Sequence, residues 1–113
     1  MYAEKIQKKA RKVGFDWPDA AGALSKVREE TAELEQAMAC GGNVEEELGD
    51  LLFAVVNVSR FAGVDAEEAL AGAARKFAGR FARLEQLAGD KLSDMSLEQM
   101  DELWDRVKRE ENR

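Results

Sequence analysis

The stretch Glu45–Val56 (EEELGDLLFAVV) decides the fold of this chain, because it joins an acidic helix start to a run that is apolar on nearly every side. A helix of that kind must be covered on nearly every side. Asn43 precedes the stretch as a predicted N-cap, and Glu46 stands three residues on to complete a capping box. We therefore expect a central helix that begins at Asn43 and that also contacts a partner subunit.

Helical spacing of apolar residues continues upstream of this stretch, and strand-like alternation is nowhere sustained. A basic helix is predicted over Tyr2–Val13. The Gly14–Pro18 segment breaks it, because glycine frees the backbone and proline opposes helix in the residue before it. A second helix is predicted from Asp19 or Leu24 to Ala39.

Downstream, the same helix-start pattern occurs twice, with Asp or Ser three residues ahead of Glu or Gln. It predicts a fourth helix over Asp65–Leu87 and a last helix over Ser96–Lys108. The sequence thus predicts an all-α fold, a helical bundle of about five helices in a single domain over residues 1–113.

Composition excludes several classes of function. The 113 residues include no histidine, which removes Ser-His and Cys-His catalysis, imidazole zinc sites and Glu-x-x-His di-iron sites. Any metal must therefore be held by oxygen, which favours magnesium, manganese or calcium. The net charge of −6 argues against binding a nucleic-acid backbone, although it allows a nucleotide whose charge cations neutralise.

Cys40 is the single cysteine, so no internal disulfide forms and a reducing cytoplasm is expected. We interpret Cys40 as an inert small residue at a helix end. Charges interrupt every hydrophobic stretch, so no membrane-spanning segment is predicted. The basic N-terminus lacks the apolar core of a secretory signal.

Two acidic pairs are the candidate chemical site. Glu30 and Glu33 follow Lys26 at spacings that place all three on one helix face. Glu47 and Asp50 share a face of the next helix in the same way. A single pair of this kind is common on solvated helices, but two pairs on adjoining helices beside an apolar run favour a site.

The short Gly41–Asn43 turn predicts an antiparallel hairpin of the two acidic helices. At about 1.5 Å of rise per residue, Glu33 and Asp50 should lie at the same height, and four carboxylates can converge. Two like charges about 4 Å apart repel by about 4 kcal/mol at an effective dielectric of about 20, so convergence favours divalent cations. Gly49, between the predicted ligands, is expected to allow close approach of the helices.

These residues resemble the MazG nucleotide pyrophosphohydrolases, and in particular their C-terminal catalytic domain. The resemblance rests on five motifs that cover nearly the whole chain. They are E-E-x-x-E at 29–33, E-L-G-D-L-L-F-A-V-V-N at 47–57, K-V-G-F-D-W-P-D at 12–19, R-K-F-x-x-R-F at 75–81 and L-W-D-R-V-K at 103–108. The common MazG form carries two such domains, whereas one is present here.

The resemblance implies a magnesium-dependent hydrolase, with manganese as a substitute ion. The reaction would convert a nucleoside or deoxynucleoside triphosphate into the monophosphate and pyrophosphate, usually in a homodimer. The implied magnesium ligands are the four carboxylates Glu30, Glu33, Glu47 and Asp50. Glu29, outside this set, is our candidate base or water-orienting group.

Basic residues are candidates for binding phosphate. Lys76, Arg80 and Arg83 form a stripe along one helix face, which by default would be a solvated surface. The resemblance assigns Lys76 and Arg80 to nucleotide contacts, and phosphate oxygens need such groups. Arg83 stays undecided, and Lys26, one turn from Glu30, is a further candidate.

Two more residues have both a structural and a functional interpretation. Asn57 is polar in an apolar helix and lies on the face of Asp50, so it satisfies a buried hydrogen bond or recognises the sugar or base. The resemblance favours recognition. Trp104 is either a core residue of the last helix or, by the resemblance, a contact for the nucleotide. Trp17 is interpreted as a packing residue.

Two other functions stay open at this point. The chain can be a non-catalytic helical dimerisation module in which the acidic residues serve solubility. It can also be a phosphoribosyl-ATP or deoxyuridine-nucleotide pyrophosphohydrolase of the same helical superfamily. Magnesium dependence separates the first alternative from an enzyme, and substrate profiling separates the second.

Overall fold

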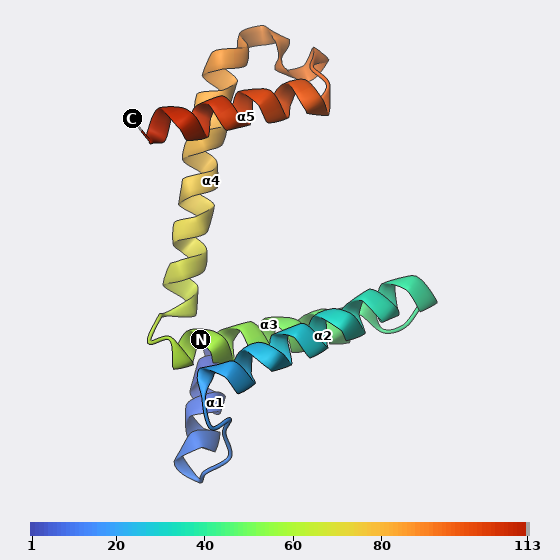
Figure 1. The fold of residues 1–113 in the computed structure, drawn as a ribbon, viewed down its shortest axis with the longest axis vertical. Coiled ribbons are helices and arrows are strands. Elements are labelled where there is room, and N and C mark those ends of the chain that lie inside the picture. The colour runs from blue at the N-terminus through green and yellow to red at the C-terminus, as the bar shows by residue number, and fades with distance from the viewer. Residues whose placement is uncertain (113) are drawn as a thin grey trace. The chain divides into compact units, whose positions relative to one another are not determined.

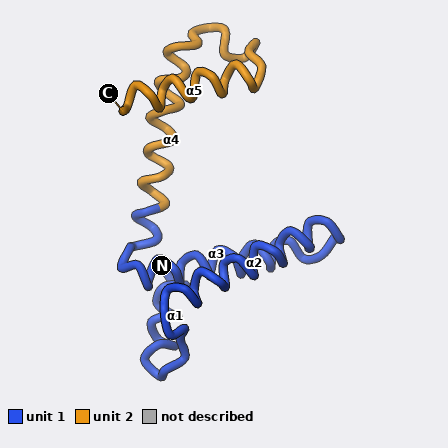
Figure 2. Tube along the Cα trace, in the orientation of Figure 1, with its two compact units in different colours: residues 1–69 blue, residues 70–113 orange. Residues whose placement is uncertain are grey.

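A computed structural model describes residues 1–112 of the chain. These residues form only helices, and the predicted all-α class is confirmed (Figure 1). In chain order the elements are α1 (Tyr2–Lys12), α2 (Ala20–Cys40), α3 (Val44–Phe61), α4 (Ala66–Ala88), the 3-10 helix η1 (Gly89–Asp94) and α5 (Leu97–Glu111). The chain divides into two compact units, Met1–Ala69 and Leu70–Arg113 (Figure 2).

The helix starts follow the capping signals of the sequence. Asp19 is the N-cap of α2, where its side chain accepts from Gly22 N at 2.9 Å, so α2 begins there and not at Leu24. Asn43 caps α3 by accepting from Glu46 N at 3.1 Å. Between them, Gly41 adopts a left-handed φ of 71°, the conformation that ends a helix most readily when the residue is glycine.

The two later starts are also confirmed. Asp65 accepts from Glu68 N at 3.1 Å ahead of α4. Ser96 and Gln99 form both halves of the capping box of α5, with bonds of 3.2 and 2.9 Å. The six-residue η1 between α4 and α5 was not predicted, and it lies in the stretch that the sequence left without an element.

In the first unit, α2 and α3 lie side by side, joined by the short Gly41–Asn43 turn, and α1 packs against α3 (Figure 1). The buried apolar residues here are small: Ala23 and Ala37 in α2 and Ala54 in α3. Small side chains at a helix contact permit a short distance between the axes. Close packing of α2 on α3 therefore brings their polar side chains within reach of one another.

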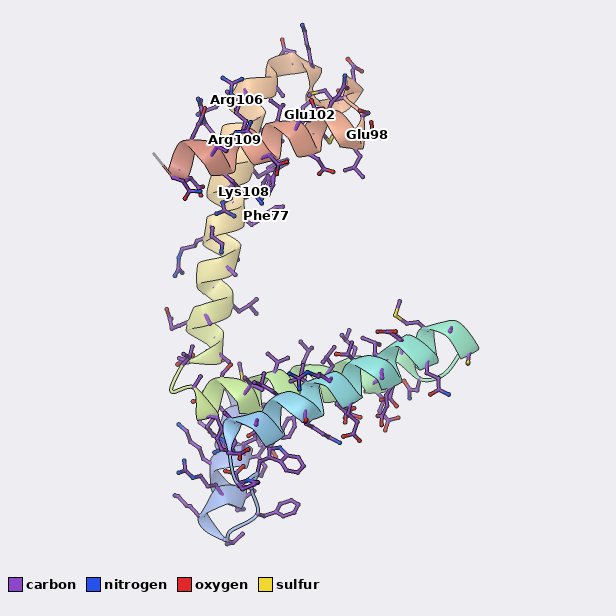
Figure 3. The ribbon with its side chains drawn as sticks, in the orientation of Figure 1. Phe77, Glu98, Glu102, Arg106, Lys108 and Arg109 are labelled. Atoms are coloured by element: carbon purple, nitrogen blue, oxygen red, sulfur yellow. The ribbon has the colours of Figure 1, made fainter. Side chains whose placement is uncertain are left out.

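In the second unit, α5 packs against α4 through an aromatic contact and buried aliphatic residues. The rings of Phe77 and Trp104 lie 5.2 Å apart, and Leu84 and Val107 are buried. Figure 3 labels Phe77 on α4 together with charged residues of α5 such as Glu102. Trp104 is half-buried and packs on Phe77 in this unit.

Part of α3 stays uncovered, because Leu52, Phe53 and Val55 are exposed, Leu52 to 59%. The contact of this helix with a partner subunit stays a prediction. The expectation for Gly49 is wrong: a Cβ placed there would meet no atom within 4 Å, so the packing of α2 on α3 does not require glycine. The buried alanines, not Gly49, permit the close contact.

Within residues 1–112, no helix combines the length and apolar character needed to cross a membrane. Cys40 ends α2 with an exposed, free thiol.

Candidate functional site

Glu30 is a buried carboxylate at the contact of α2 with α3. Only 5% of the residue is exposed. Lys26 Nζ lies 2.9 Å from Glu30 Oε1, one helical turn earlier on the same face. Glu30 Oε2 is buried and has no hydrogen-bond partner among the described residues. A buried oxygen of this kind calls for a ligand or a cation, because almost all buried polar atoms in folded proteins are paired.

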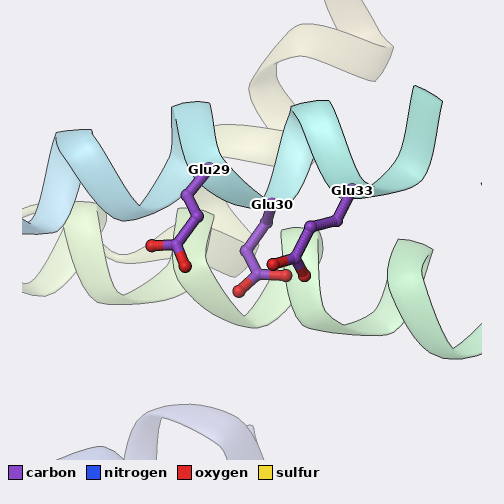
Figure 4. A group of neighbouring side chains, drawn as sticks. All are labelled: Glu29, Glu30 and Glu33. Carbon is purple, nitrogen blue, oxygen red and sulfur yellow. The ribbon is translucent and has the colours of Figure 1, made fainter. Parts of the chain in front are cut away.

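Glu30 joins two groups of carboxylates. Ligand oxygens of Glu30, Glu47 and Asp50 lie within 4.8 Å of one another across α2 and α3. Oxygens of Glu29, Glu30 and Glu33 lie within the same distance along α2 (Figure 4). The structure therefore brings together all five acidic residues that the sequence singled out.

The electrostatics of this cluster are unfavourable without added positive charge. The negative charge of Glu30 raises the pKa of Glu33, and partial burial and the nearby Glu47 raise it further. Lys26 offsets part of the repulsion: its hydrogen bond to Glu30 and its contact with Glu29 at 3.4 Å raise the pKa of the ammonium group. One lysine cannot balance five carboxylates.

The donor set fits a hard divalent cation. All its ligand atoms are carboxylate oxygens, which magnesium and manganese prefer. Glu47 Oε2, like Glu30 Oε2, is buried without a hydrogen-bond partner among residues 1–112. Two buried, unpaired oxygens from facing helices are what a bound cation would satisfy, so Glu30 and Glu47 are the centre of the candidate metal site.

A cavity of about 280 Å³ opens beside these carboxylates. It is lined by Glu30 and Asp50 and also by Trp17, Lys26, Phe53, Ala54 and Asn57. Asn57 was predicted to share a face with Asp50, and both line this space. The cavity is therefore lined by carboxylates, the Lys26 ammonium group and aromatic side chains. A charged organic ligand needs a site of this composition.

A half-buried ion pair between Arg60 and Asp16 fixes the orientation of Asn57. Arg60 donates to Asn57 Oδ1 at 2.6 Å and to Asp16 Oδ1 at 2.6 Å. The hydrogen bond from Arg60 holds the pKa of Asp16 below its ordinary value. Because Arg60 occupies Oδ1, the amide nitrogen of Asn57 is the group left to contact a ligand.

Sequence reasoning missed three features of this region. Trp17 is 43% exposed and lines the cavity, a position that its interpretation as a packing residue did not predict. Phe53 was treated only as part of the apolar run. Arg60 and Asp16 are 44 positions apart, and no spacing rule connects them in a single sequence. The short K-V-G-F-D-W-P-D motif was the one signal that pointed to the loop.

The remaining predicted contacts lie in the second unit, on α4 and α5. Arg80 pairs with Glu111 at 2.9 Å, and this contact raises the pKa of Arg80 and lowers that of Glu111. Arg83 pairs with Glu110 at 3.0 Å, while Lys76 is exposed. These pairs join α5 to α4, and a role of Lys76, Arg80 or Trp104 in binding nucleotide stays a prediction.

Comparison with known proteins identifies the family. The model of the MazG nucleotide pyrophosphohydrolase domain matches residues 19–83. The chain belongs to this family. The MazG match covers α2, α3 and most of α4, so it contains all five clustered carboxylates together with Lys76 and Arg80. Trp17 and Trp104 fall outside the matched range.

Two relatives carry the MazG activity in their names. A Thermotoga maritima protein named nucleoside triphosphate pyrophosphohydrolase/pyrophosphatase MazG is 46% identical over an alignment of 109 positions, which covers 94% of this chain and 42% of that protein. The Escherichia coli K12 nucleoside triphosphate pyrophosphohydrolase is 43% identical over an alignment of 118 positions, which covers 98% of this chain and 45% of that protein. The chain thus spans less than half the length of these relatives.

A Bacillus subtilis protein, the uncharacterized protein YabN, is 49% identical over an alignment of 74 positions, which covers 63% of this chain and 15% of that protein.

The crowding at Glu33 predicts how stability changes with pH. The unfolded chain releases the Glu33 proton near pH 4.5, the ordinary value, whereas the folded chain holds it to higher pH. In metal-free buffer, stability should therefore fall as the pH rises from 4.5 through the raised pKa. Glu33→Gln should unfold at a higher temperature than wild type at pH 7 and at a similar temperature near pH 4.

The control is Glu35→Gln, an exposed glutamate of α2 outside both carboxylate groups. It should leave the pH profile of thermal unfolding unchanged. Equal destabilisation of both variants at pH 7 would show that the carboxylates do not repel one another in the folded chain.

Proposed function

We propose that this chain is a magnesium-dependent nucleoside triphosphate pyrophosphohydrolase that converts ribo- and deoxyribonucleoside triphosphates into the monophosphate and pyrophosphate. The observation that carries the proposal is the convergence of carboxylates from α2 and α3 on Glu30, with buried, unpaired oxygens on Glu30 and Glu47. The names of the MazG relatives support the reaction class.

Glu30, Glu33, Glu47 and Asp50 would hold the magnesium, with manganese as an alternative ion. When bound, the ion supplies positive charge to the phosphate oxygens and makes water at the site more acidic. The role of the protein is to keep four carboxylates fixed on two packed helices. That preorganisation places charge where the reacting phosphate needs it.

Glu29 is the proposed base or water-orienting residue. One of its oxygens lies within 4.8 Å of oxygens of Glu30 and Glu33, yet its side chain is exposed enough to contact water. Lys26, paired with both Glu29 and Glu30, can contact a phosphate oxygen when substrate enters. The resemblance to the MazG family also assigns Lys76 and Arg80 to nucleotide contacts, and phosphate oxygens need such basic groups.

We further propose that the chain works as a homodimer. Leu52 and Val55 of α3 are exposed apolar residues in a helix that also supplies Glu47 and Asp50. Exposed apolar surface of this kind favours association, and most homo-oligomers are symmetric dimers.

Asp50→Asn should lower magnesium-dependent turnover by roughly 100-fold or more, because an amide is a poorer ligand than a carboxylate and carries no charge. Circular dichroism should show the helical content unchanged. Glu45→Gln, an exposed residue outside the cluster, is the matched control and should keep wild-type turnover. Full activity of Asp50→Asn at saturating substrate would rule out this metal site.

The phosphorus atom that water attacks can be identified from the product that acquires the solvent oxygen. The resemblance to the MazG family implies that water attacks the phosphate nearest the sugar, so reaction in heavy-oxygen water should label the monophosphate. Mass spectrometry of both products measures the label. Label in pyrophosphate would mean attack at the beta phosphorus, and orthophosphate as the first product would reject the reaction class.

Light scattering at micromolar concentration should give the mass of a dimer, and Leu52→Glu should shift it to that of a monomer, because a buried charge disfavours association. Leu97→Glu, at an exposed leucine of α5, should leave the mass unchanged. A wild-type monomer would refute the dimer.

A further inference from the structure

A second cavity, of about 340 Å³, lies between α1, the loop at Gly14–Pro18 and α3. Three of its lining residues, Trp17, Phe53 and Asn57, also line the cavity beside the carboxylates. The two spaces are therefore neighbours within the first unit, and one elongated ligand can occupy both.

We propose that this second cavity holds the nucleobase, and that Gln7 selects bases with an amino group at purine C6 or pyrimidine C4, adenine and cytosine, over hypoxanthine and uracil, which carry a carbonyl oxygen there. The proposal rests on the proposed function for the class of ligand. It adds a binding site for the base and a residue that determines base specificity, neither of which is part of the proposed metal site.

The walls of the cavity suit a flat aromatic ring. Its lining includes three aromatic residues, Phe15, Trp17 and Phe53. All three are exposed, so the core does not cover them. Aromatic side chains stack on every base, because each base has a π-face. Stacking therefore explains binding of a base in this cavity but gives no discrimination among bases.

Discrimination comes from the amide of Gln7. This residue is 7% exposed and lines the cavity. Its Nε2 donates to the main-chain oxygen of Phe53 at 2.9 Å, while its Oε1 is buried and has no hydrogen-bond partner among the described residues. An unpaired buried acceptor of this kind is costly, and an N–H donor from a ligand would satisfy it.

The amide cannot adapt to a different base by rotating. Reversal of Gln7 would set its oxygen against the carbonyl oxygen of Phe53, and two acceptors repel. That carbonyl is fixed in the middle of α3. Gln7 therefore presents an acceptor, which matches the amino group of adenine or cytosine and opposes the carbonyl oxygen that replaces it in hypoxanthine or uracil.

Asn57 complements this arrangement at the junction of the two cavities. Because Arg60 occupies its Oδ1, the amide nitrogen is the group available to a ligand. A donor here suits an acceptor on the sugar or base. Asp16, which holds Arg60, belongs to the same loop as Trp17, so the ion pair positions both the stacking residue and the donor.

The first test compares nucleotides that differ at the edge of the base proposed to face Gln7. Adenine and cytosine carry an amino group there beside an unprotonated ring nitrogen, whereas hypoxanthine and uracil carry a carbonyl oxygen beside a ring N–H. Wild type should hydrolyse ATP with a kcat/KM roughly tenfold or more above that for ITP, and CTP likewise above UTP, because a site built around a hydrogen bond rejects the analogue that cannot make it. Gln7→Met, which keeps the volume and removes the acceptor, should reduce both ratios toward one. Gln36→Met, at an exposed glutamine of α2, should leave both ratios unchanged.

A binding measurement tests the nucleobase site independently of hydrolysis. The α,β-methylene analogues of ATP and ITP cannot be cleaved at the proposed bond. On titration, the NMR signal of the Trp17 indole N–H, assigned with Trp17→Phe, should shift, and the ATP analogue should bind more tightly. Binding with this preference but without hydrolysis of ATP would support the pocket and reject the proposed function.

Two outcomes would refute the nucleobase site or the role of Gln7. Hydrolysis of ATP and ITP with equal kcat/KM, together with a Trp17 signal that does not respond, would reject the nucleobase site and leave the proposed function intact. If Gln7→Met weakened both analogues equally and kept the wild-type ratio, Gln7 would only join α1 to α3, and selection by its amide would be refuted.

Discussion

Mutual repulsion among carboxylates at the contact of α2 and α3 is the constraint on which the rest of the structure depends. Glu30 is buried there with one unpaired oxygen, and oxygens of Glu47 and Asp50 approach it from the facing helix. The carboxylates meet where α2 packs on α3, and Lys26 compensates only part of the charge. A divalent cation would resolve this conflict, so the fold and the proposed chemistry would have the same physical origin.

Helix α3 connects the proposed metal site to the two cavities lined by aromatic residues. One part of α3 supplies carboxylates, the next supplies Phe53, and Asn57 and Arg60 follow one turn apart. Arg60 then reaches back to Asp16 and holds the loop that carries Trp17. A single rigid element thus positions the carboxylates, a donor and an aromatic wall, and rigid support is what keeps a binding site accurate.

The sequence predicted most of the helical framework, because helix starts depend on capping residues close by in the chain. Asp19, Asn43, Asp65 and Ser96 cap helices as their spacing to a following residue predicted. The carboxylates were also found, since residues three or four apart share a helix face. The role of Gly49 was misjudged, because only the tertiary contact reveals which small residues lie between the helices.

By itself the sequence determined the all-α class, the helix starts, the oxygen-only character of any metal site and the resemblance to the MazG family, all of which follow from local patterns and composition. Tertiary structure alone decided that Arg60 pairs with Asp16, that Gln7 donates to Phe53, and that Trp17 lines two cavities. These contacts join residues far apart in the chain. Their partners are selected by the packing of whole helices, and no spacing rule along one sequence encodes that.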